Sequence, residues 1–225
     1  MATLFRVGND YSTNKAPRIP VCICIDTSKE NVPGDRMEDL NCFLEMVTEH
    51  INSNSELKAK VQLCVLSYGE ETTLISDFAS VDNKHYTLSS STGAPDLCKA
   101  INKYFELMNA RIRLYKAESI SHYLPQLVLL SSGKSSTDVT EIAKRLCLAQ
   151  LSNKLCVLPF QIIDNDSDLL TKLTDDGVVY TEITNFERNF NCLKSGLELL
   201  STSSASAGKS LKSHAITLNK VFKKG

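Results

Sequence analysis

The sequence contains no tryptophan, and none of its apolar runs approaches the ~20 residues that a helix needs to span a bilayer. Its first residues, MATLFRVGND, also lack the apolar segment of a secretory signal. No charge of one sign dominates, because 25 lysines and arginines stand against 26 aspartates and glutamates. Since neither a membrane span nor a signal is visible, we expect a cytoplasmic protein.

With 42% hydrophobic and 23% charged residues, the chain has the composition of an ordinary globular protein, which excludes a wholly disordered one. Its 225 residues allow one large domain or two small ones. The 8 cysteines belong to a chain too long to need disulfides for its core, so we expect free thiols. The closest pair, Cys22 and Cys24, would share one face of a strand and act as small core residues.

Short apolar runs alternate with helical stripes along the chain. The run over 21–25, bounded by Pro20 and Asp26, is typical of a strand buried on both faces. Further strands are predicted over 61–66, 73–78, 126–130, 155–163 and 178–181, and helices over 35–51, 93–115, 137–149, 168–173 and 186–200. The connection between the second and third strands is too short for a parallel crossover, which indicates a hairpin.

Two prolines fall at positions with special backbone requirements. Pro95 is expected in the first turn of its helix, where the missing N–H costs nothing. Pro159 lies inside the predicted strand over 155–163, so we expect either a bulge there or a strand on only one side of it.

The alternation predicts an α/β fold: a doubly wound, Rossmann-like, mostly parallel six-stranded sheet with one antiparallel edge strand and helices on both faces. We divide the chain into an N-terminal extension over 1–17, one domain over 18–201 and a flexible Ser-rich, Lys-rich tail over 202–225. The tail carries five lysines and no acid, which leaves a charge of -6 on residues 1–201. It lacks arginine and has Phe222 as its one aromatic residue, so we expect a solubilising end or a contact with an acidic partner, and no nucleic-acid binding.

Ligands of such sheets bind at the carboxyl ends of the strands. In this chain that edge is formed by the loops after Ile25, before Pro95 and after Leu130, which together we call the crest.

The stretches that build the crest resemble the von Willebrand factor A domain, and in particular its bacterial cytoplasmic branch, which includes proteins associated with tellurium resistance. The resemblance rests on residues 18–28, 65–69, 88–95, 127–133 and 193–206, in that order along the chain. It covers about residues 18 to 206 and implies a protein-interaction module of this fold.

The resemblance also implies a divalent-metal site formed by an Asp-x-Ser-x-Ser loop, a threonine in the second loop and an aspartate in the third. Such oxygen ligands would suit Mg²⁺. Asp26 and Ser28 match this pattern, but the other positions hold Glu30, Ala94 and Ser132. We therefore expect a degenerate metal-ion-dependent adhesion site that binds no metal tightly, with Asp26 acting as a strand-end cap.

We predict a non-enzymatic scaffold that binds a protein partner through the crest and uses no catalytic residue and no cofactor. The residues expected at the crest are Asp26, Ser28, Glu30, Thr92, Asp96 and Ser132. From the resemblance, a phosphatase, a kinase or a stress-response protein is the expected kind of partner.

Two alternatives remain open. One is a Mg²⁺-dependent adhesion module, in which Thr92, Glu30 or Asp96 completes the metal site. The other is a hydrolase or phosphatase with Asp26 as nucleophile, although Ser28 stands where an Asp-x-Asp motif needs its second aspartate. No Gly-x-Gly-x-x-Gly follows the first strand and the four histidines are scattered, so neither dinucleotide binding nor a catalytic triad is indicated.

Overall fold

The computed structural model describes residues 14–203 except positions 83, 165–167, 177–178 and 180–185. Five strands form its sheet, in the order β3-β2-β1-β4-β5. They are β1 (Ile19–Asp26), β2 (Val61–Tyr68), β3 (Thr72–Ala79), β4 (Gln126–Ser131) and β5 (Cys156–Gln161). All neighbours pair in parallel except β2 and β3, which form the predicted antiparallel hairpin.

This sheet has one strand fewer than predicted. The sixth strand was expected over 178–181, and all of that segment except Val179 lies outside the described residues. The mostly parallel α/β fold with one antiparallel edge strand is confirmed.

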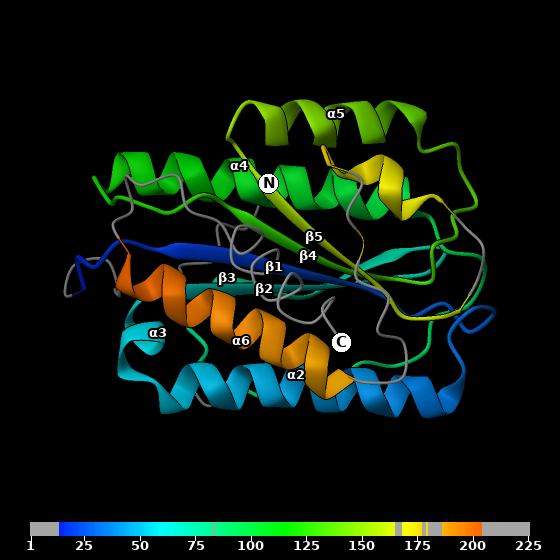
Figure 1. The fold of residues 1–225 in the computed structure, drawn as a ribbon, viewed down its shortest axis with the longest axis horizontal. Coiled ribbons are helices and arrows are strands. Elements are labelled where there is room, and N and C mark those ends of the chain that lie inside the picture. Colours follow the sequence, from blue (N-terminus) through cyan, green and yellow to red (C-terminus); the bar gives the residue numbers. More distant parts are fainter. Residues whose placement is uncertain (1–13, 83, 165–167, 177–178, 180–185, 204–225) are drawn as a thin grey trace, which may run out of the picture.

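Helices cover both faces of the sheet (Figure 1). On one face lie α2 (Gly34–Ser53), α3 (Ser55–Lys60) and α6 (Phe186–Thr202), and on the other α4 (Leu97–Ala117) and α5 (Thr140–Leu151), followed in the chain by the 3₁₀ turn η1 (Leu170–Leu173). Among these described helices, none combines the length and hydrophobicity that crossing a membrane requires.

The central strand β1 supplies both cores. Ile23 and Ile25 belong to the cluster that packs under α2 and α6, whereas Cys22 and Cys24 belong to the cluster under α4 and α5. Side chains alternate between faces along a strand, and all eight residues of β1 are buried. All 8 cysteines are free thiols, as predicted, and burial raises the pKa of Cys22 well above its ordinary value.

Both proline expectations need correction. Helix α4 begins at Leu97, so Pro95 precedes the N-cap, Asp96, and does not occupy the first turn. Strand β5 runs without interruption through Pro159, which pairs with Leu129. The amides of Cys156 and Ile162 donate toward the β4 side, to Pro125 and Ser131, so the nitrogen of Pro159 faces away from β4 and no ladder bond is lost.

Helices α5 and α3 also differ from what the sequence predicts. Helix α5 begins at Thr140, three residues after the predicted Thr137. The short helix α3 was not predicted, because Leu57 is its only buried residue and gives no stripe; its start is set by Asn54, whose side chain accepts from the amides of Glu56 and Leu57.

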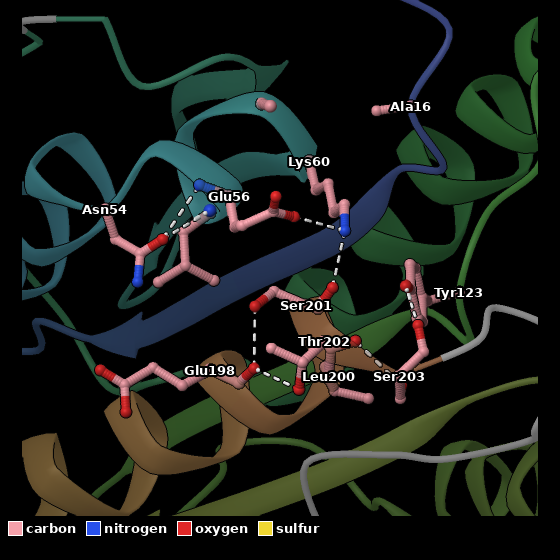
Figure 2. A network of polar contacts seen from close by, with 12 residues as sticks. Ala16, Asn54, Glu56, Lys60, Tyr123, Glu198, Leu200, Ser201, Thr202 and Ser203 are labelled. Carbon is pink, nitrogen blue, oxygen red and sulfur yellow. Dashed lines mark hydrogen bonds and ion pairs between the residues drawn. The ribbon is translucent and has the colours of Figure 1, made fainter.

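The end of α6 is held at the amino ends of the strands (Figure 2). Lys60 Nζ donates to the carbonyl of Ser201 at 2.6 Å, and the hydroxyl of Tyr123 donates to the carbonyl of Ser203 at 2.6 Å. These carbonyls belong to the last turn of α6 and beyond, where no intrahelical donor remains. Since Lys60 directly precedes β2 and Tyr123 lies three residues before β4, residue 203 lies at the amino ends of the strands, opposite the crest.

Lys60→Met should lower the free energy of unfolding by about 1–2 kcal/mol, because it removes the charged donor to Ser201 while keeping an apolar stem. Glu56→Gln is the matched control: it removes the ion pair of 2.7 Å to Lys60 and leaves the bond to Ser201. We expect this pair, in which the Glu56 side chain is 60% exposed, to contribute under about 0.5 kcal/mol. Urea unfolding of the two variants would contradict this assignment if Glu56→Gln cost as much as Lys60→Met.

Candidate functional site

Asp26 is the last residue of β1, and its carboxylate lies at the centre of the crest. Oδ1 accepts from the amide of Ser28 at 2.9 Å and from its hydroxyl at 2.6 Å. Oδ2 accepts from the amide of Ser132 at 3.2 Å and from its hydroxyl at 2.5 Å. Each carboxylate oxygen thus accepts two protein donors, which is the cap role that the sequence suggests for Asp26.

This carboxylate is sealed from solvent. Asp26, Ser28 and Ser132 are each 0% exposed. Burial raises the pKa of Asp26, and the hydrogen bonds from Ser132 and Ser28 offset that rise only in part.

The third loop reaches Asp26 through a sharp turn. Gly133 has a φ of 75°, a conformation that favours glycine, and its amide donates to the hydroxyl of Ser131 at 3.1 Å. The turn places Ser132 over the end of β1. Below it, the buried hydroxyl of Tyr68 donates to the same Ser131 hydroxyl at 2.9 Å.

The second loop is joined to the first by backbone hydrogen bonds. The amide of Ser91 donates to the carbonyl of Thr27 at 2.8 Å, and the amide of Lys29 donates to the carbonyl of Ser91 at 2.9 Å. The Ser91 side chain lies so close to Gly69 that a Cβ there would stand 2.0 Å from the serine Oγ. Glycine at position 69 therefore lets this loop close over the end of β2.

Asp96 acts as a helix cap in this structure. Its Oδ1 accepts from the amide of Lys99 at 3.0 Å and from the hydroxyl of Thr137 at 3.0 Å. The amide of Ser136 donates to the carbonyl of Pro95 at 2.7 Å. These contacts join the second loop to the third. Because Asp96 Oδ1 already accepts two hydrogen bonds, this oxygen is not a free ligand.

The six residues predicted for the crest fall into two sets. Asp26, Ser28, Asp96 and Ser132 are buried, whereas Glu30 and Thr92 are exposed. Sequence reasoning missed Ser91, which faces inward and accepts from the hydroxyl of Thr27 at 3.2 Å. Ser91 forms a parallel bridge with Ser28, so its neighbour Thr92 points the opposite way.

Exposed charged side chains surround the sealed centre. Lys29 and Glu30 follow β1, and Lys134 follows the turn at Gly133; all three are exposed. Lys29 and Lys134 were not singled out from the sequence, because an exposed lysine in a loop gives no pattern. A partner that approaches the crest would meet these side chains and Thr92 first.

The arrangement does not fit the metal site that the family resemblance implies. Mg²⁺ prefers an octahedron of oxygen ligands, but the hydroxyls of Ser28 and Ser132 already donate to Asp26. Thr92 is exposed, and Asp96 caps a helix. Across the described ranges, no group of three or more His, Cys, Asp or Glu side chains is placed to hold a metal ion.

The parallel sheet with one antiparallel edge strand and helices on both faces is an α/β fold similar to that of von Willebrand factor A domains. Similar solved structures include proximal thread matrix protein 1 from the mussel byssus, with 13% identity, a TM-score of 0.52 and coverage of 84% of this chain and 47% of that one. The ArnB paralog VWA2 from Sulfolobus acidocaldarius gives 14% identity, a TM-score of 0.55 and coverage of 81% and 46%. The SpRpn10 VWA domain gives 13% identity, a TM-score of 0.52 and coverage of 76% and 95%.

The chain thus spans about half the length of the first two proteins and nearly all of the third. No protein-family model matches the sequence. No curated protein matches it in sequence either. At these identities the likeness establishes the fold alone.

Proposed function

We propose that this chain is a non-enzymatic protein-interaction module that binds its partner through the crest without a tightly bound metal. The observation that carries the proposal is the set of four hydrogen bonds that Ser28 and Ser132 donate to the buried carboxylate of Asp26. A cation at a crest of this kind would neutralise the carboxylate; here the neutral amides and hydroxyls of Ser28 and Ser132 donate hydrogen bonds to it instead. The exposed Lys29, Glu30, Thr92 and Lys134 then form the contact surface.

The structural neighbours support a module of this kind. They include a matrix protein of the mussel byssus and the VWA domain of SpRpn10. The mussel protein has also been solved with a zinc-occupied MIDAS motif, at 11% identity and a TM-score of 0.54. A metal-dependent crest is therefore the alternative within this fold, whereas the bonded geometry of Asp26 favours the metal-free one.

A hydrolase that uses Asp26 is the alternative of another class. A nucleophilic carboxylate must reach its substrate, but Asp26 is 0% exposed and each oxygen accepts two bonds. Among the described residues its hydrogen-bond partners are Ser28 and Ser132, neither of which is a general base. These contacts favour a structural role for the carboxylate. A phosphatase screen with turnover that depends on Asp26 would contradict the proposal.

The partner surface can be tested with two charge-reversed double variants of the full chain. Lys29→Glu with Lys134→Glu changes the crest, and Lys116→Glu with Lys154→Glu makes the same charge change at the opposite edge of the sheet. We expect the crest variant to recover a stable partner from the native host at least about tenfold less well than the wild type, while the other variant recovers it normally. Equal recovery by both variants would overturn the crest as the binding surface. A phosphatase, kinase or stress-response protein among the partners would support the narrower proposal.

Calorimetry with Mg²⁺ and Mn²⁺ tests the metal-free crest directly. We expect no micromolar binding to the wild-type chain. Micromolar binding that is lost in Asp26→Asn, with folding confirmed by circular dichroism, would instead establish the metal-dependent alternative.

A further inference from the structure

A second candidate site lies at the amino ends of the strands, on the opposite side of the sheet's length from the crest. A groove of about 610 Å³ opens between α4 and α5, above the segments that lead into β4 and β5. This volume falls within the range of small-molecule pockets, about 300–1,000 Å³. Its floor is apolar and includes Met108, Ile112, Leu124, Pro125 and Leu155.

The charges at the groove have one sign. Lys116 and Lys154 line it and are exposed, and the partly buried His122 also lines it; no aspartate or glutamate is among its lining residues. The side chains of Lys116 and Lys154 form no ion pair within the described part of the chain. A basic rim above an apolar floor is complementary to a molecule with an anionic head and an apolar body.

A buried donor adjoins the same groove. Tyr104 lines it and is 1% exposed, yet its hydroxyl has no hydrogen-bond partner among the described residues. Buried hydroxyls are normally paired, and leaving one unpaired is unfavourable. The groove thus combines apolar area, unpaired cations and an unused donor, none of which the crest requires.

We propose that this groove binds a small anionic amphiphile, with its apolar chain on the floor and its anionic head between Lys116 and Lys154. The chain's own tail fits less well, although Ser203 is bonded to Tyr123 at the rim. The segment over 204–225 carries five lysines and no acid, which the rim lysines would repel. The charge of the rim therefore favours a free anion.

The absence of tryptophan makes a specific reporter available. Phe105 lines the groove and lies 3.8 Å under the guanidinium of Arg145, a stacking that tryptophan can keep. In full-length Phe105→Trp, dodecanoate is titrated below its micelle-forming concentration while the emission of this single tryptophan is followed. Dodecyl maltoside and dodecyltrimethylammonium, which have the same chain length, serve as neutral and cationic probes.

We expect saturable binding of one dodecanoate, at least about tenfold weaker when Lys116→Glu and Lys154→Glu are added. Lys29→Glu with Lys134→Glu should leave the affinity within about twofold, because those lysines lie at the crest. Three results would each overturn the proposal: no saturable change, equal weakening by both double variants, or equal affinity for the cationic probe. A negative result for dodecanoate would leave the crest proposal intact. That proposal is tested by partner recovery, which should fall in the crest variant and stay normal in the variant with Lys116→Glu and Lys154→Glu.

Discussion

Asp26→Ala is expected to lower the free energy of unfolding by about 4 kcal/mol. The substitution leaves two amides and two hydroxyls, those of Ser28 and Ser132, without their acceptor at a fully buried position. Each buried donor left unpaired costs about 1–3 kcal/mol, and local rearrangement recovers part of the total. Urea unfolding at neutral pH measures the loss, and a loss under about 1 kcal/mol would contradict the account of Asp26 as the centre of the crest.

Asp26→Asn separates the shape of the side chain from its charge. The amide keeps one acceptor oxygen, so we expect a smaller loss of about 1–2 kcal/mol. Burial raises the pKa of Asp26 above the ordinary value of about 3.9. The folded state therefore holds this proton more tightly than the unfolded state does.

The sign of the pH dependence follows from that raised pKa. As the pH falls through the folded-state pKa toward about 3.9, the contribution of Asp26 to stability increases, and it is lost again as the pH rises. The wild type should therefore gain stability relative to Asp26→Asn on acidification across this window. Paired urea titrations at several pH values measure the difference in unfolding free energy between the wild type and Asp26→Asn. If the wild type lost stability relative to Asp26→Asn toward acid, burial would not be the dominant influence on the pKa of Asp26.

The fold could be predicted because its signals are local. The run from Val21 to Ile25 is apolar without interruption, which indicates a strand covered on both faces, and all of it is buried. The connection between β2 and β3 is too short for anything except a hairpin, and a hairpin is found. Helix starts were less well predicted, since Pro95 lies outside the first turn and the N-cap of α4 is Asp96.

The crest was predicted in its location but not in its contacts. The positions of Asp26 and Ser28 follow from the end of β1, whereas the bond from Ser132 joins residues 106 positions apart. The sequence indicated Thr92, which is exposed, and missed its neighbour Ser91, which accepts from Thr27; adjacent residues of a segment paired like a strand point to opposite faces. Gly69 was the available clue, because a glycine directly after a strand indicates close approach of another segment.

The contacts at the opposite edge had no sequence signal at all. Lys60 and Ser201 are 141 positions apart, and a single lysine at the end of a short helix does not indicate its acceptor. The groove likewise depends on how far apart α4 and α5 lie above the sheet, since residues of both helices line it. Periodicity shows which face of a helix is buried and gives no information about the spacing between two helices.

Ser132→Asp is expected to make the crest depend on a divalent cation. The new carboxylate would stand where the Ser132 hydroxyl lies 2.5 Å from Asp26 Oδ2, and two buried carboxylates that close cannot both ionise without a large cost. We expect a loss of about 3–5 kcal/mol at neutral pH in the presence of a chelator, on the scale of an uncompensated buried charge.

Millimolar Mg²⁺ should recover much of that loss, because a hard cation between the two carboxylates binds the folded state alone. Ser132→Asn is the matched control, because asparagine has nearly the same size as aspartate and carries no charge. The stability of this variant should therefore not respond to Mg²⁺. Urea unfolding of the wild type, Ser132→Asp and Ser132→Asn, each with and without Mg²⁺, provides the comparison. If Mg²⁺ stabilised the wild type as much as Ser132→Asp, the serine would not be substituting for an ion, and the metal-free crest would be wrong.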